Sequence, residues 1–135
     1  MCSPGNPWGK IIDKQTLESI IEICTKNSCY LIVDSVYSEL YFDTERPYYP
    51  TDIINEYIFY VNSFSKLFSI TGWRIGYFLC SKSHFAELKS IHDYIGLSSP
   101  APLQVAIAKF MNDKEAKDNY VSGLRKKISD NFFTQ

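Results

Sequence analysis

The segment 61–77 contains the residues whose types and spacing point most directly to chemistry. It reads VNSFSKLFSITGWRIGY, so Lys66 follows the two serines Ser63 and Ser65, and Arg74 lies eight positions further along. A lysine amine can form a Schiff base with an aldehyde cofactor. Hydroxyl groups and a guanidinium can bind a phosphate on that same cofactor. The combination predicts a site for pyridoxal 5'-phosphate.

Two further motifs upstream contain polar side chains that a pyridine ring would need. Residues 3–9 read SPGNPWG and contain Asn6 in a turn, while residues 33–39 read VDSVYSE and contain Asp34 and Tyr37. A pyridoxal cofactor draws electrons into a protonated ring, so the protein must hold a carboxylate against the ring nitrogen. Asp34 is the candidate, because it ends an apolar strand pattern and α/β sheets bind ligands at the carboxyl ends of their strands.

The three motifs, in this order, resemble those of the class I/II aminotransferases, the aspartate aminotransferase-like group of fold type I. SFSKLFSITGWRIGY resembles the cofactor-lysine segment of that family, SPGNPWG its Asn-Pro-Thr-Gly turn, and VDSVYSE its Asp-x-x-Tyr strand end. The chain departs from the family at Trp8, where threonine is usual. We expect the large indole to crowd or reshape the approach to Asn6.

The resemblance implies a role for each residue near the cofactor ring. Lys66 is implied as the catalytic residue, first as the covalent anchor and then as the general base that moves the substrate Cα proton. Asp34 is implied on the ring nitrogen. Asn6 and Tyr37 are implied on the phenolic oxygen of the ring, where they would stabilise its negative charge.

The resemblance also implies a phosphate-binding group formed by Ser63, Ser65 and Arg74. The two serines are two positions apart, so on an extended segment both could face the phosphate. Gly72 and Gly76 would permit tight turning and close backbone approach there.

Each candidate also has an ordinary structural explanation. Asp34 could cap a turn, Tyr37 could fill core space, and Asn6 could form an Asx-turn. Arg74 could form an ion pair with a carboxylate, and Lys66 could be an ordinary solvated lysine. The presence of all three motifs in order favours the cofactor interpretation.

Strands are predicted over residues 30–34, 58–62 and 75–80. The first is short, apolar and β-branched, which is typical of a strand buried on both faces of a parallel sheet. Residues 41–57 contain prolines and polar residues, which predicts a surface loop with one short helical turn near residues 53–54. Strands alternate with helices, so the predicted class is α/β, as part of the large domain of a fold type I pyridoxal-phosphate enzyme with a mainly parallel sheet flanked by helices.

Four helices are predicted. Asp13 is the expected N-cap of an amphipathic helix that ends near Asn27. After residue 83 the chain is expected to be helical, with a break around residues 96–102 and a charged final helix from about residue 114. The helix between them places an apolar stripe on one face, formed by Leu103, Ala106, Ile107 and Phe110.

Three strands are few for a doubly wound sheet with two helical layers. Together with the resemblance, this leads us to expect that residues 1–135 are a partial cofactor-binding large domain. The small domain and the N-terminal part of the large domain are expected to be absent from this sequence.

Composition excludes several classes of partner. A net charge of -1 over 135 residues gives no electrostatic footprint for nucleic acid or for an anionic membrane surface. No apolar run approaches the roughly 20 residues of a membrane span. The four cysteines have no CxxC spacing and the two histidines share no metal-ligand spacing with them, so no metal site is predicted. We expect a reduced, cytoplasmic setting.

The leading interpretation is an aminotransferase fragment that moves an amino group between an amino acid and a 2-oxo acid. The resemblance suggests a homodimer for the full-length protein. One alternative is another fold type I enzyme, a lyase or a synthase, because the same carbanion can be partitioned in several ways. A second alternative is a non-catalytic truncated remnant that keeps the motifs and binds no cofactor.

Overall fold

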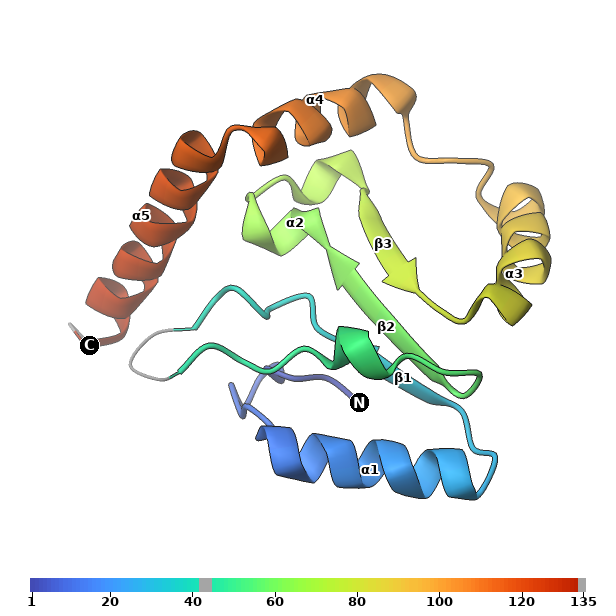
Figure 1. Cartoon of the computed structure of the whole chain (residues 1–135). Helices are drawn as coiled ribbons and strands as arrows, with labels where there is room; N and C mark the ends of the chain where they lie inside the picture. Colours follow the sequence, from blue (N-terminus) through green and yellow to red (C-terminus); the bar gives the residue numbers. More distant parts are fainter. Residues whose placement is uncertain (42–44, 134–135) are drawn as a thin grey trace.

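A three-stranded mixed sheet forms the centre of the computed structural model, which describes residues 1–41 and 45–133 (Figure 1). The strands are β1 (Leu31–Asp34), β2 (Ile58–Ser63) and β3 (Gly76–Leu79), in the order β1-β2-β3. β1 and β2 are parallel, whereas β3 runs antiparallel to β2. The predicted α/β class is confirmed, with parallel pairing limited to the first two strands.

Helix α1 (Lys14–Lys26) packs along one side of this sheet (Figure 1). Asp13 is its N-cap, and the Asp13 carboxylate accepts a hydrogen bond from the Thr16 backbone N–H at 2.8 Å. The apolar residues at helical spacing turn Leu17 and Ile21 inward, and both are buried. The helix ends at Lys26 with Asn27 as its C-cap, so its predicted start and end are both confirmed.

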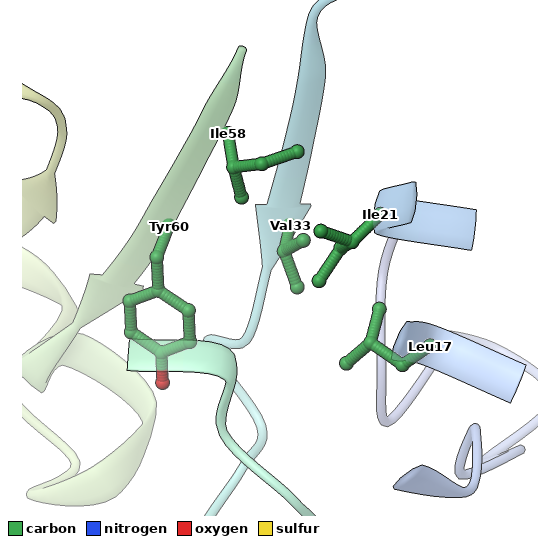
Figure 2. Close-up of a cluster of buried hydrophobic side chains, with 5 residues drawn as sticks. All are labelled: Leu17, Ile21, Val33, Ile58 and Tyr60. Atoms are coloured by element: carbon green, nitrogen blue, oxygen red, sulfur yellow. The ribbon is translucent and has the colours of Figure 1, made fainter. Parts of the chain in front are cut away.

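The buried core lies between α1 and the first two strands. Figure 2 shows the five side chains of this cluster, which come from α1, β1 and β2, with Ile21 and Val33 facing each other: Leu17, Ile21, Val33, Ile58 and Tyr60. The strand register places Val33 beside Tyr60, which puts both on the face that α1 covers. Complete burial of a valine, leucine or isoleucine side chain contributes about 1.5–3 kcal/mol, so this cluster is the main source of stability near the sheet.

The opposite face of the sheet has much less cover. Val33 is 1% exposed, but its neighbour Ile32 is 56% exposed on the other face. The prediction that strand 30–34 is buried on both faces is therefore wrong. A parallel strand is buried on both faces only where helices lie over both, and α1 covers only one of them.

The connection 50–75 links the core to the rest of the chain. A 3-10 turn over Pro50–Ile53 confirms the short helical turn predicted near residue 53. After β2, Ser63 caps the short helix α2 (Phe64–Leu67), and a second 3-10 turn over Thr71–Trp73 leads into β3. Because the chain turns back over this short distance, the residues on both sides of α2 lie close to the carboxyl end of β2.

Three helices follow β3 and form an arc beyond it in Figure 1. They are α3 (Lys82–Ile95), α4 (Ala101–Asn112) and α5 (Lys114–Phe133). On the predicted α4 stripe Ile107 is buried and Phe110 is partly buried, with the Phe110 ring 5.1 Å from that of Phe68. None of the helices in the described ranges is both long and apolar enough to cross a membrane.

Candidate active site

Lys66 lies one turn beyond the carboxyl end of β2, in a position fixed by Ser63. The Ser63 Oγ accepts a hydrogen bond from the Ser65 backbone N–H at 3.1 Å and donates one to the Ile75 carbonyl at 3.2 Å. The first bond caps α2 and the second joins α2 to the start of β3. The Lys66 side chain is exposed, and its amine is therefore accessible to a small molecule.

Three of the predicted residues, one from each motif, lie together. The Asn6 Nδ2 donates a hydrogen bond to the Tyr37 Oη at 3.0 Å, across 31 positions of sequence. The Lys66 Nζ lies 5.9 Å from the centre of the Tyr37 ring. An amide, a phenol and a primary amine thus converge at one place from segments that are far apart in the chain.

Asp34 is the last residue of β1, and its backbone is paired with the N-terminal segment. Its N–H donates to the Met1 carbonyl at 2.8 Å, and its own carbonyl accepts from the Ser3 N–H at 3.0 Å. One carboxylate oxygen accepts from the Val36 N–H at 3.1 Å, the turn-capping contact expected for an ordinary strand-end aspartate. The strand register pairs Asp34 with Val61, two residues before Ser63, so Asp34 and Ser63 share one face at the carboxyl ends of neighbouring strands.

Arg74 occupies a constrained backbone position next to these residues. Its φ of 53° and ψ of 45° lie in the left-handed region, which is uncommon for a residue with a side chain. The guanidinium donates to the Thr71 carbonyl at 3.1 Å, and in the part of the chain that the structure describes no carboxylate forms an ion pair with it. The ordinary ion-pair explanation therefore does not describe this arginine.

Ser65 differs from its expected placement. The prediction that Ser63 and Ser65 lie on one extended segment is wrong, because α2 begins at Phe64 and includes Ser65. Ser65 is buried, while Ser63 is partly exposed. A serine directly before a helix is a strong N-cap, and the capping bond of Ser63 draws the chain into a helix at this point.

Gly76 allows β3 to approach β2 closely beside Ser63. A Cβ at Gly76 would lie 2.7 Å from the Asn62 carbonyl oxygen, which no real side chain tolerates. At Gly72 the same test meets no atom within 4 Å, and its backbone is not left-handed. The expectation of close approach is thus confirmed for Gly76. Gly72 lies in the 3-10 turn Thr71–Trp73, so the expected tight turn is present there without a close approach.

Trp8 does not crowd Asn6. Its side chain is 88% exposed, and the hydrogen bond between Asn6 and Tyr37 is intact. Trp8 lines a cavity of roughly 420 Å³ together with both of these residues. The expectation of crowding is wrong, whereas a reshaped approach agrees with the place of Trp8 in the lining of this cavity.

Asn62 supports the site and was not singled out from the sequence. Its Oδ1 accepts from the Ser63 N–H at 2.7 Å, and its Nδ2 donates to the Tyr60 Oη at 3.0 Å and to the Ser38 Oγ at 3.2 Å. The available signal was an amide side chain at the polar end of an apolar strand, directly before the serine of the lysine motif. Its partner Ser38 is almost completely buried.

Comparison with known proteins identifies the family. The profile of the aminotransferase class I and II family matches residues 1–132. The chain belongs to this family. A probable aspartate aminotransferase of Methanocaldococcus jannaschii is 37% identical over 69% of this chain and 24% of its own length. A probable kynurenine–oxoglutarate transaminase of Saccharomyces cerevisiae is 36% identical over 96% of this chain and 30% of its own length.

Solved structures show the same relationship for the fold. The aspartate aminotransferase of Thermus thermophilus with maleate superimposes with a TM-score of 0.86 at 28% identity, over 93% of this chain and 33% of that structure. Fold type I is therefore confirmed, as is the predicted relationship to the class I/II aminotransferases. The chain spans about a quarter to a third of the length of these relatives.

Membership of this family implies pyridoxal phosphate in general terms, and the described residues can be tested against that cofactor. Asn6, Tyr37 and Lys66 lie together and fit the part of the cofactor where an aldehyde is next to a phenolic oxygen. The Lys66 amine suits the aldehyde, and the Asn6 amide and the Tyr37 phenol suit the phenolic oxygen. Asp34 fits as a carboxylate at the carboxyl end of the adjacent strand. On the phosphate side, the Ser63 hydroxyl donates its single proton to the Ile75 carbonyl and would have to exchange this bond for a phosphate oxygen. The Arg74 guanidinium donates from Nη1 to the Thr71 carbonyl and keeps its other N–H groups for the phosphate.

Proposed function

We propose that this chain supplies the cofactor-binding centre of an aminotransferase that moves an amino group between an amino acid and a 2-oxo acid. The observation that carries the proposal is the convergence of Asn6, Tyr37 and Lys66 from three separate motifs. Because the chain spans only part of its relatives' length, the substrates and the activity of the whole protein belong to this proposal. A homodimeric assembly and a cytoplasmic location stay predictions.

Each residue near the cofactor ring has a distinct role in this proposal. Bound pyridoxal phosphate would supply an electron sink for the bonding electrons of the substrate Cα. The Lys66 amine would anchor the cofactor covalently and, when released, accept the proton from that carbon. Asp34 would hold a positive charge on the ring nitrogen, and Tyr37 with Asn6 would hold the phenolic oxygen.

The phosphate would be bound at the turn on either side of α2. Ser63 lies at the helix N-terminus, Arg74 lies two residues before β3, and the Ile75 carbonyl joins the two segments. A guanidinium and a hydroxyl are suited to phosphate oxygens by charge and by donor geometry. Ser65 is buried beneath this turn and would contribute from within it.

Covalent trapping tests the proposal directly. The purified chain would be incubated with pyridoxal phosphate, reduced with borohydride and digested, and the modified lysine located by mass spectrometry. We expect one dominant adduct at Lys66 that is lost in Lys66→Arg, while Lys66-independent labelling at exposed lysines such as Lys10 stays at background level. Equal labelling of many lysines, unchanged by Lys66→Arg, would support the non-catalytic remnant instead.

A second measurement separates amino transfer from the lyase or synthase alternative. The names of the relatives found here are those of aminotransferases, which favours transfer. An amino acid presented to cofactor-loaded protein should yield the corresponding 2-oxo acid and leave the nitrogen on the protein-bound cofactor. Release of free ammonia, or loss of a substrate carbon, would favour the alternative.

A further inference from the structure

We propose that Glu39 is a positioning residue for this site, acting on Tyr37 and Ser63 through a cluster of polar contacts that also ties down α5. The proposal rests on the function proposed above. Glu39 lies two residues after Tyr37 but none of the three motifs assigns it a role.

The Glu39 carboxylate is bound by two arginines. One oxygen accepts from the Arg46 Nη2 at 2.6 Å and from the Tyr49 Oη at 2.9 Å, and the other accepts from the Arg125 Nη2 at 2.6 Å. The Arg125 Nε also donates to the Glu39 carbonyl at 2.7 Å. Arg125 thus holds both the side chain and the backbone of a residue 86 positions away.

Burial makes the contact with Arg125 the stronger of the two. The side chains of Glu39 and Arg125 are only 22% and 25% exposed, whereas that of Arg46 is 62% exposed. Charge-assisted hydrogen bonds are stronger than neutral ones, and screening by water weakens an exposed pair. The Arg125 guanidinium also lies 4.1 Å from the centre of the Tyr41 ring, which fixes it from the other side.

A chain of polar contacts leads from this cluster to the candidate site. The Tyr49 hydroxyl lies 2.9 Å from both the Glu39 carboxylate and the carbonyl of Ser38, the residue next to Tyr37, and it donates its single proton to one or the other. The Ser38 Oγ accepts from the Asn62 Nδ2 at 3.2 Å. Asn62 in turn accepts the backbone N–H of Ser63 at 2.7 Å. The same groups line one cavity of about 500 Å³, whose wall includes Glu39, Asn62 and Ser63.

This arrangement constrains the site from two directions. The Leu40 N–H donates to the Tyr37 carbonyl at 2.9 Å, so the backbone around Glu39 and that around Tyr37 belong to one turn. Loss of the Glu39 charge would release Arg125 and free the turn to move. A small displacement of this turn would move the Tyr37 phenol. Through Ser38 and Asn62 it would also move the backbone amide of Ser63.

The test compares Glu39→Gln with Glu22→Gln, the same chemical change on the exposed face of α1. Two readouts are measured: the dissociation constant for pyridoxal phosphate, and the amide resonances of Tyr37, Asn62 and Ser63 in the cofactor-free chain. We expect Glu39→Gln to weaken cofactor binding about tenfold, as the loss of a hydrogen bond to a charged group would, and to shift those resonances. Glu22→Gln should change neither readout.

Substitutions of Arg125 refine the test. Arg125→Lys keeps the charge but loses the two-point contact, so we expect an intermediate effect, below that of Arg125→Met. The double variant Glu39→Gln with Arg125→Met should weaken binding no more than the stronger single variant, because both changes remove one interaction. Additive losses would overturn the proposed linkage.

The outcomes separate this inference from the proposed function. If the wild-type chain forms no adduct at Lys66, the function proposed above fails, while the cofactor-free resonances still decide the role of Glu39. If Glu39→Gln lowers stability to urea but leaves the resonances of Tyr37, Asn62 and Ser63 unshifted, Glu39 is only structural and the inference is overturned. If Glu39→Gln does not fold, Arg125→Lys decides by the same resonances.

Discussion

The two faces of the central sheet differ in how well they are covered, although the strands look equally apolar in sequence. On one face Val33, Ile58 and Tyr60 pack against α1 and are almost completely buried. On the other face the side chains of Ile32 and Phe78 remain largely exposed. The apolar pattern predicts where a strand forms, but the cover over each face depends on residues far away in the chain.

The less covered face is also the one that leads to the candidate site. Ile32 and Asp34 alternate along β1 and point to the same face, and their partners on β2 are Phe59 and Val61. An apolar surface thus ends at a carboxylate at the carboxyl edge of the sheet.

Truncation of one isoleucine on each face gives the largest expected contrast. Ile58 is fully buried, so Ile58→Ala should lower the free energy of unfolding by about 2–5 kcal/mol through lost burial and a new cavity. Ile32→Ala, on the other face, should lower it by less than about 1 kcal/mol. Urea unfolding followed by circular dichroism measures both. Equal losses would show that the two faces are equally covered in solution.

A pair of glycine substitutions tests the close approach of β3 to β2. Gly76→Ala forces a Cβ against the Asn62 carbonyl and should cost about 1–3 kcal/mol. Gly72→Ala meets open space and should change stability by no more than about 1 kcal/mol. The same urea experiment applies. A neutral Gly76→Ala would mean that the two strands separate easily.

Stability at high pH tests the packed side of the molecule. Burial raises the pKa of Tyr49 to about 12, from an ordinary value of 10.0. The folded state therefore keeps this proton over a range in which the unfolded chain has lost it, so stability should fall as the pH rises from about 10 to about 12. Tyr49→Phe should reduce that slope, although it also removes a hydrogen bond at neutral pH. Tyr94→Phe, at an exposed position of α3, is the control and should leave the slope unchanged.

The smallest effects are expected in α3, which contains no buried residue among those that the structure describes. Ile95→Ser should change the free energy of unfolding by less than about 0.5 kcal/mol. Hydrogen exchange should show faster exchange for the α3 amides than for those of β2, because exposed helices open at lower free energy. Equal protection of α3 and β2 would show that α3 is packed in solution.

The sequence predicts the locally encoded elements well. Asp13 and the spacing from Leu17 to Ile21 are sufficient for α1, because capping and amphipathic periodicity involve residues within a few turns. The exposure of Ile32 could not be predicted, since it depends on which elements cover a face. β3 runs antiparallel to β2 after a turn in which Arg74 adopts a left-handed backbone, and the residue types of this turn do not indicate that conformation.

The candidate site was predicted mainly through its three motifs. Their meeting point is recovered at Asn6, Tyr37 and Lys66, while their roles toward the cofactor stay predictions. The contact between Glu39 and Arg125 could not have been found in the same way. It joins residues 86 positions apart by side-chain hydrogen bonds, and such pairings leave no periodic signal.

The left-handed backbone at Arg74 has a practical consequence for protein engineering. Glycine adopts this conformation without steric cost, so a screen for heat resistance alone would tolerate or even select Arg74→Gly. If Arg74 binds the phosphate as proposed above, a screen for retention of the vitamin B6 coenzyme would reject the same variant. Selection for thermal stability would therefore favour glycine at this position, whereas selection for cofactor binding would favour arginine.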